Sequence, residues 1–329
     1  MQKNRTERDA QEARLLSDAR LQMASVLMGV GSVLLITYAL QMVLSLVLSA
    51  VVPSVFDRDW FSIVFSTLPM YAVAMPLSLL FFGIGKAEKA REEMRLSFPA
   101  LLGLAAICFA LSYAGSFLGR ATNAILSLLR GEPVVDRLQE LTMATPLWAN
   151  LLFCGILAPI LEELFYRKLV IDRLRGFGEL PAVLISGILF GLIHGNFGQL
   201  FYAVTVGLLL GLVYVKTGRL RYTVGLHMAV NLVGGVFAAE LSKHLDTASL
   251  LQAPLSYLAE HPLPAVAYLL YEVFLLACLI AAPFATVRLA RHAKPTPAGE
   301  SLPSGWVRSV LPQNPAFWFF LVACALLWL

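Results

Sequence analysis

Nine long apolar runs constrain the fold of this chain more than any other feature. They lie at residues 24–52, 61–84, 98–118, 147–166, 180–194, 197–215, 222–239, 264–287 and 316–329. Most reach the roughly 20 residues that a helix needs to cross a bilayer, whereas the fifth and the last are shorter. A helix satisfies its backbone polar groups internally, as lipid requires. The runs therefore predict an all-α membrane protein, a bundle of eight or nine transmembrane helices.

The composition agrees with this class of protein. Hydrophobic residues make up 58% of the chain and charged residues 14%, and the mean hydropathy is +0.74, far from the soluble globular norm. The net charge of +4 does not indicate a nucleic-acid partner, because the basic residues fall in short clusters between apolar runs. The four cysteines lie within apolar runs without CxxC spacing, as buried small hydrophobes do. The expected surroundings are a lipid bilayer.

Basic residues orient the predicted bundle, because they precede the first run and follow each even-numbered run. Those that follow are Lys86, Lys89, Arg91, Arg95, Arg167, Lys168, Arg173, Arg175, Lys216, Arg219, Arg221, Arg288, Arg291 and Lys294. The positive-inside rule then places the N-terminus and these loops in the cytoplasm. The compact chain, without a retrieval signal at its end, favours a bacterial cytoplasmic membrane.

Two adjacent carboxylates, Glu162 and Glu163, interrupt the fourth run, and Arg167 follows one turn later. Ionisable residues inside a membrane helix are expensive to bury and indicate a functional site. Glu163 and Arg167 are four residues apart with the acid first, which favours an ion pair on one helix face. Glu162 points about 100° away, so we expect it to face a cavity. The alternative is an acid–base cluster at the cytoplasmic surface.

Two later runs carry histidines with partners at helical spacing. Phe190 precedes His194 by four residues at the end of the fifth run, and His227 precedes Asn231 by four in the seventh. The second pair places an imidazole and a carboxamide side by side on one helix face. Each pair alone also fits a structural use, as an interfacial histidine or as a polar contact between helices.

A helical hairpin predicts which of these groups meet. Glu162 and His194 each lie about 16 residues from the turn near Gly178, and hence at a similar depth of about 24 Å from it. His227 lies only six residues beyond the preceding basic loop, which is about 9 Å deep in the simplest drawing. Tilted spans, or a segment 167–179 that projects beyond the membrane, would bring all three to one cavity open to the cytoplasm.

These groups at one water-accessible cavity fit hydrolysis by activated water. A carboxylate between apolar walls gains proton affinity and can act as a general base. Carboxamide and imidazole N–H groups stabilise an oxyanion by a few kcal/mol each. No serine or cysteine nucleophile is paired with these groups in the sequence. A zinc site of Glu162, His194 and His227 is the alternative use of the same residues, although the sequence has no HExxH motif.

The three motifs together resemble a known family. EExxxR at residues 162–167, FxxxH at 190–194 and HxxxN at 227–231, in this order on consecutive membrane helices, are similar to the motifs of the CAAX protease and bacteriocin-processing (CPBP, "Abi") intramembrane proteases. The type II CAAX prenyl endopeptidase belongs to the same group. The resemblance covers about residues 146–241, so the first 145 residues and the last span match only as additional helices.

The resemblance implies an eight-helix glutamate-dependent protease fold. We expect no cofactor, with zinc as the alternative. The implied catalytic residues are Glu162, the base that activates water, His194, which helps to hold and deprotonate that water, and His227 with Asn231, which form the oxyanion hole; the supporting residues are Glu163, Arg167 and Phe190. The chain would divide into a cytoplasmic tail (1–23), additional membrane helices (24–145), a protease core (146–241), and a C-terminal part (242–329) that contains a Pro/Gly/Ser-rich linker at 293–305.

We therefore expect an intramembrane endopeptidase that hydrolyses peptides or membrane-associated proteins near the cytoplasmic face. One alternative is a non-catalytic membrane immunity or scaffold protein of the same fold, which keeps the polar cluster to bind a partner. The other is a zinc-dependent membrane protease. A transporter is disfavoured, because the polar residues gather at one depth instead of lining a path, and because the sequence shows no internal repeat.

Overall fold

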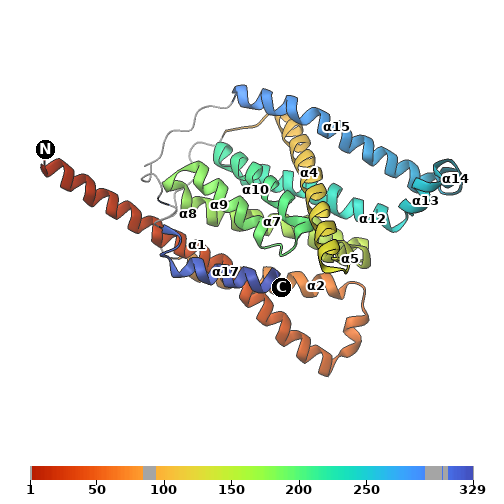
Figure 1. Ribbon diagram of the computed structural model, residues 1–329, viewed down its shortest axis with the longest axis horizontal. Helices are drawn as coiled ribbons and strands as arrows, with labels where there is room; N and C mark the ends of the chain where they lie inside the picture. Colours follow the sequence, from red (N-terminus) through yellow and green to blue (C-terminus); the bar gives the residue numbers. More distant parts are fainter. Residues whose placement is uncertain (1, 84–93, 293–305, 307–309, 329) are drawn as a thin grey trace.

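The computed structural model describes residues 2–83, 94–292, 306 and 310–328, and within these ranges the chain is all-α, with no strands (Figure 1). The predictions for Lys86, Lys89, Arg91 and Lys294, and for the linker 293–305, lie outside the described residues.

The helical elements follow the apolar runs closely. In chain order they are α1 (Gln2–Val51), η1 (Pro53–Asp57), α2 (Phe61–Leu68), η2 (Pro69–Ala74), α3 (Met75–Phe82), α4 (Phe98–Arg130), α5 (Arg137–Ala144), α6 (Leu147–Ala149), η3 (Asn150–Leu157), α7 (Ala158–Glu163), η4 (Leu164–Ile171), α8 (Asp172–Leu174), η5 (Arg175–Phe177), α9 (Glu179–Leu192), α10 (Phe197–Thr217), α11 (Leu220–Val230), η6 (Asn231–Phe237), α12 (Ala238–Lys243), α13 (Thr247–Gln252), α14 (Pro254–Glu260), α15 (Pro262–His292) and α17 (Pro315–Trp328).

Seven helices of the described chain are long and apolar enough to cross a membrane, and α9 and α17 are shorter apolar helices. Several spans combine consecutive elements, so that α6 to η5 form one rod (Leu147–Phe177) and α11 to α12 another (Leu220–Lys243). Leucine, valine and phenylalanine side chains are exposed on their outer faces, above all on α15, as lipid contact requires. The chain is a multi-pass helical membrane protein, and the predicted fold class is confirmed.

Two helices of the structure continue beyond the ends of predicted apolar runs. The N-terminal segment 1–23 and the first apolar run were predicted as separate parts, yet α1 continues from Gln2 to Val51 without a break. The third run was predicted to end at residue 118, yet α4 continues to Arg130 and ends where Gly131 adopts a left-handed backbone with φ of 74°. No proline lies at either place, and Gly119, directly after the third run, does not end the helix, so in both places the helix propagates beyond the apolar stretch.

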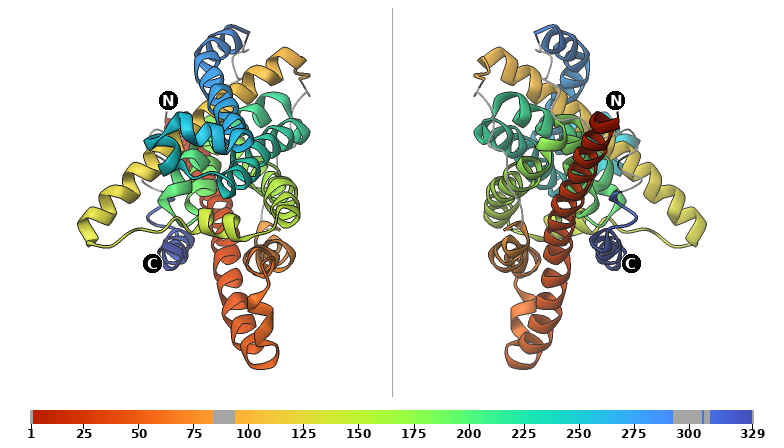
Figure 2. Two further views of the ribbon diagram at one scale, coloured as in Figure 1. Left: turned by 90° about the vertical axis from the view of Figure 1, so that its right-hand side faces the viewer. Right: turned by 90° about the vertical axis from the view of Figure 1, so that its left-hand side faces the viewer.

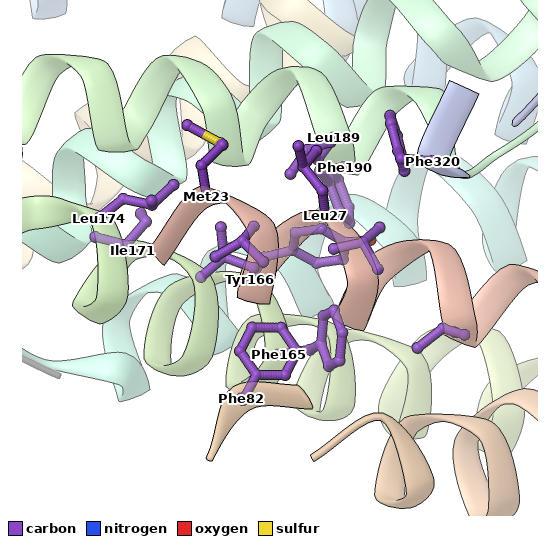
Figure 3. Packing of buried hydrophobic residues seen from close by; sticks show 14 of the residues in the cluster. Met23, Leu27, Phe82, Phe165, Tyr166, Ile171, Leu174, Leu189, Phe190 and Phe320 are labelled. Atoms are coloured by element: carbon purple, nitrogen blue, oxygen red, sulfur yellow. The ribbon is translucent and has the colours of Figure 1, made fainter. Parts of the chain in front are cut away.

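The N-terminal and C-terminal helices lie side by side against the middle of the chain. Helix α1 packs along α17, α3 and η2, and Figure 2 shows it as a long rod that extends beyond the rest of the bundle. Figure 3 shows buried side chains from five elements gathered at this junction, namely Met23 and Leu27 of α1, Phe82 of α3, Phe165 of η4, Phe190 of α9 and Phe320 of α17. On the other side of the bundle, α4 packs against α10 and α15.

A tight turn forms the predicted hairpin between the fourth and fifth apolar runs. The rod ends at Phe177, Gly178 adopts a φ of 121° that favours glycine, and α9 begins at Glu179. Helix α9 ends at Leu192, because Gly195 has a φ of 66° and the Asn196 side chain caps α10 by accepting from the Gln199 N–H at 2.9 Å. His194, predicted as the last residue of the fifth run, therefore lies in the turn just after α9.

Four elements of the spans are π-helical, which widens the backbone locally. These are η2, η3, η4 and η6. The short α7 lies between η3 and η4, and η6 begins at Asn231. Widened turns of this kind occur frequently at functional sites, because they rotate side chains away from the regular helical register.

Candidate active site

Helix α7 ends with the two adjacent carboxylates, and both are buried. Glu162 is 7% exposed and Glu163 is not exposed at all. Successive side chains of a helix are rotated by about 100°, so the two carboxylates meet different neighbours. A buried charge persists only with a partner, and the contacts of each carboxylate therefore define its use.

Glu163 forms a buried ion pair with Arg167 on its own helix. Arg167 Nε donates to Glu163 Oε2 at 2.8 Å and Nη2 to Oε1 at 3.1 Å, and Arg167 is fully enclosed. The remaining Nη1 donates to Ser186 Oγ of α9 at 3.1 Å, and the Ser186 hydroxyl donates to the Tyr166 carbonyl. The predicted ion pair is confirmed, and Ser186, which the sequence analysis did not single out, links it to the neighbouring helix.

His227 of α11 lies between the two carboxylates. Its Nδ1 is 3.1 Å from Glu163 Oε1, and its Nε2 is 3.7 Å from Glu162 Oε2. An ionised carboxylate can only accept hydrogen bonds, so the Nδ1 of His227 carries a proton and donates it to Glu163. Untilted helices would place His227 much closer to the cytoplasmic ends of the spans than Glu162. The structure nevertheless brings the two side chains together.

Tyr71 of η2 also contacts Glu162. Its hydroxyl donates to Glu162 Oε1 at 2.6 Å. The sequence did not predict a role for Tyr71, because a single tyrosine in an apolar run has no partner at helical spacing and Glu162 lies 91 residues later. The glutamate thus has one oxygen held by Tyr71 and the other directed toward the imidazole of His227.

The ring of Phe190 connects both histidines to the ion pair. It makes edge-on contacts with His194 at 5.0 Å and with His227 at 5.6 Å between ring centroids. The guanidinium of Arg167 lies over the same ring at 5.6 Å, as in a cation–π contact. His194 Nδ1 is 2.7 Å from the Phe190 carbonyl. When that nitrogen carries the proton, Nε2 of His194 has a free lone pair.

Asn231, at the start of η6, is directed toward η3. Its Nδ2 donates to the Cys154 carbonyl at 2.9 Å. An amide NH₂ group has two donors, so this bond occupies one of them. Of the four predicted catalytic residues, Glu162 and His227 lie in direct proximity, His194 joins them through Phe190, and Asn231 lies one helical turn beyond His227 with one donor engaged.

An apolar pocket of about 190 Å³ lies beside Glu162, between the span of α2 and η2 and the rod of η3 and α7. Its lining residues are Thr67, Leu68, Tyr71, Ala72, Phe153, Leu157 and Leu161. Leu161 directly precedes Glu162, and Tyr71 hydrogen-bonds to Glu162. The polar cluster therefore borders a space with apolar walls, where charge interactions are stronger than in water.

The arrangement of possible metal ligands bears on the zinc alternative. Across the part of the chain that the structure describes, no group of three or more histidine, cysteine, aspartate and glutamate side chains is placed to hold a metal ion. Glu162 and His227 are close, but the imidazole of His194 packs against Phe190. Of the three candidate zinc ligands, the structure thus brings two, Glu162 and His227, within 3.7 Å of each other.

Comparison with known proteins agrees with the motifs. Residues 144–233 match the family model described as type II CAAX prenyl endopeptidase Rce1-like. The matched segment contains Glu162, Glu163, Arg167, Phe190 and both histidines with Asn231, whereas Tyr71 lies outside it. No curated protein and no solved structure matches the chain.

Proposed function

We propose that this chain is a CAAX-type intramembrane endopeptidase that hydrolyses peptides or membrane-associated proteins near the cytoplasmic face, with Glu162 as the base. The observation that carries the proposal is the asymmetry of the two carboxylates. Glu163 is neutralised by Arg167 and hydrogen-bonded to His227, while Glu162 keeps Oε2 beside the Nε2 of His227. A carboxylate without a guanidinium partner in an apolar membrane interior suits a general base.

In the proposed reaction, Glu162 removes a proton from a water molecule as the water oxygen attacks the carbonyl carbon of the scissile peptide bond. The tetrahedral intermediate then collapses, the C–N bond breaks, and the proton taken by Glu162 passes to the leaving nitrogen. The products are a new carboxyl terminus and a new amine. His194, with its Nδ1 hydrogen-bonded to Phe190, would use Nε2 to help hold and deprotonate the water.

His227 and Asn231 would stabilise the developing oxyanion. With Nδ1 committed to Glu163, His227 donates toward the substrate only when Nε2 also carries a proton. In that form the buried cluster holds two carboxylates, one guanidinium and one imidazolium, and it has no net charge. A neutral cluster is the least costly arrangement in an apolar interior. Asn231 has a second amide N–H besides the one donated to Cys154.

The proposed orientation places the N-terminus and the turn at Gly178 in the cytoplasm. It rests on the basic residues near that turn, among them Lys168, Arg173 and Arg175, together with the positive-inside rule. Substrates would then reach Glu162 from the cytoplasmic side. The four-part division of the chain at residues 23, 145 and 241 belongs to the same proposal, with the core close to the matched segment 144–233.

The experiment that tests the function compares purified wild type, Glu162→Gln and Glu162→Ala in proteoliposomes against a fluorogenic peptide library, with and without a metal chelator. Glu240→Gln, which alters a carboxylate on α12 that is ion-paired with Lys243, is the matched control. We expect both Glu162 variants to lose about 10²–10⁴-fold in rate, the control to match wild type, and the chelator to have no effect.

Each other outcome would contradict a defined part of the proposal. Cleavage by Glu162→Gln at the wild-type rate would remove Glu162 as the base. Loss of wild-type activity on chelation, with recovery on addition of zinc, would support the zinc-dependent reading of the same residues. Absence of cleavage by wild type across the library, with partner binding preserved in Glu162→Gln, would support a non-catalytic scaffold.

A further inference from the structure

The strongest feature that the motifs do not explain is the hydrogen bond from Tyr71 to Glu162. It is short, at 2.6 Å between the hydroxyl and Oε1, and it comes from a helix that precedes the matched segment. Tyr71 lies in the π-helical turn η2, between Pro69 and Pro76. A widened turn displaces a side chain from the regular helical register, and here that side chain reaches the proposed base.

The span that carries Tyr71 is fixed at both of its ends. Gln41 Nε2 of α1 donates to the carbonyls of Phe65 and Ser66 at 3.2 and 3.3 Å. Near the other end, Ser25 Oγ of α1 donates to the Phe81 carbonyl at 2.6 Å. These bonds join the span to α1 over about four turns of helix, so the position of Tyr71 is fixed relative to α1.

The same span is also packed directly onto the helix of the glutamates. The ring of Phe82 meets that of Phe165 edge-on, with centroids 5.4 Å apart, and both side chains are buried in the cluster of Figure 3. Phe165 lies three residues beyond Glu162. The hydrogen bonds to α1 and the contact of Phe82 with Phe165 thus both fix the position of this span. The hydroxyl of Tyr71 therefore meets Glu162 at a defined position.

We propose that Tyr71 is a positioning residue for the reaction, and this inference rests on the proposed function. Its hydroxyl holds Oε1 of Glu162 and thereby fixes the rotation of the carboxylate, so that Oε2 stays directed to the space beside Nε2 of His227. Without this bond the carboxylate rotates about its terminal side-chain torsion, which is broad. The span that carries Tyr71, which precedes the matched segment 144–233, would then contribute a residue to the active site and would not be only an additional membrane helix.

The variant Tyr71→Phe tests this role, because it removes the hydroxyl and keeps the ring in the wall of the apolar pocket. We expect kcat to fall about tenfold to a hundredfold, as misplacement of a reacting group does. We expect KM to stay within about twofold of wild type, because the loss concerns the transition state. The control Tyr38→Phe makes the same change at a tyrosine of α1 that is 57% exposed, and it should match wild type.

A merely structural role for the hydroxyl predicts a different result. It would lower the thermal unfolding midpoint in detergent and leave kcat unchanged at temperatures where the protein stays folded. Retention of wild-type kcat by Tyr71→Phe at such a temperature would overturn the proposal. An equal loss of kcat in Tyr38→Phe would also overturn it, because the effect would then not depend on Glu162.

A second measurement separates this inference from the proposed function. In infrared spectra of protein with ¹³C-labelled glutamate, Glu162→Gln should remove one carboxylate band, and Tyr71→Phe should shift that same band while Tyr38→Phe leaves it in place. An unshifted band in Tyr71→Phe would contradict the hydrogen bond and the inference with it. A wild-type protein that cleaves no peptide would contradict the proposed function, while the infrared result still decides on Tyr71.

Discussion

The region around Glu162 and the contact between α4 and α10 are stabilised in opposite ways. Around Glu162, a few directional contacts between buried polar groups hold the helices together, such as Arg167 with Glu163 and Ser186. Between α4 and α10, the backbones themselves approach closely. A Cβ atom added at Gly115 would lie 2.4 Å from the Tyr202 nitrogen, and one at Gly119 would lie 2.4 Å from the Phe197 oxygen.

This difference separates the region proposed to carry out the reaction from the region that only holds the helices together. In lipid, apolar side chains alone give little force to bring helices together, so helices use either close approach through small residues or buried polar pairs. The α4–α10 contact uses the first, and the contacts of α7, η4, α9 and α11 use the second. Substitutions in the polar region should thus alter activity and stability in separable ways, whereas substitutions at the glycine contact should alter stability alone.

The largest loss of stability should follow from Arg167→Leu. It leaves Glu163 buried without its counter-charge, which costs about 3–5 kcal/mol in the free energy of unfolding. Activity should fall as well, because Glu163, the hydrogen-bond partner of His227, is no longer held by Arg167. Unfolding in detergent–denaturant titrations measures the first effect. The double variant Glu163→Gln/Arg167→Leu removes both charges and should recover part of the stability. A double variant as unstable as Arg167→Leu would contradict the account of the ion pair.

Asn231→Ala should reduce kcat by about 10²–10³-fold, the usual effect of losing one oxyanion donor. The same variant also loses the bond to the Cys154 carbonyl, a cost of about 1 kcal/mol in stability. Peptide cleavage and thermal unfolding, measured on the same preparation, separate the two effects. A rate that falls only in proportion to the unfolded fraction would show that Asn231 is a helix contact and not an oxyanion donor.

Gly115→Val should destabilise the protein by about 1–3 kcal/mol, because the new side chain meets the backbone of α10. The folded fraction should keep the wild-type kcat and KM. The matched control is Gly225→Ala on α11, where an added Cβ meets open space and stability should be nearly unchanged. Altered kcat in folded Gly115→Val would break the proposed separation between the two regions.

The smallest effect should come from Lys243→Ala at the end of the seventh span. Lys243 Nζ contacts Glu240 Oε2 at 2.9 Å and donates to the Thr145 carbonyl at 2.7 Å, but both charged side chains are partly exposed. Pairs of this kind contribute about 0–1 kcal/mol. Unfolding titrations should therefore show a change within this range, and a loss above about 2 kcal/mol would mean that the polar region extends further than the contacts of Glu162 and Glu163.

The sequence predicted most of the polar region because local rules apply to it. Glu163 and Arg167 lie on one helix at i, i+4, so their ion pair follows from helical geometry alone. The membrane spans follow from hydropathy, and the hairpin at Gly178 follows from the glycine and from the basic loop. These predictions require no knowledge of how distant helices pack.

The rest depends on tertiary packing, which the sequence does not encode locally. The contact of His227 with both carboxylates depends on the relative depth of two membrane-spanning rods. For untilted helices, the nominal depths of Glu162 and His227 differ by about 15 Å along the membrane normal. Tyr71 reaches Glu162 through a π-helical turn, and an isolated tyrosine in an apolar run indicates neither the turn nor the partner. The role of the glycines of α4 and α10, which is to allow close backbone contact, can be recognised only when the two helices are known to be adjacent.

The central claim, that Glu162 activates water for peptide hydrolysis, is tested most directly in ¹⁸O-labelled water. A single turnover is followed with wild type and with Glu162→Gln in excess over peptide, and mass spectrometry locates the label. We expect one solvent-derived oxygen in the new carboxyl terminus with wild type, none in the side chain of Glu162, and product formation that is about 10²–10⁴-fold slower with Glu162→Gln. Label in the Glu162 carboxylate, or labelled product from Glu162→Gln at the wild-type rate, would contradict the central claim.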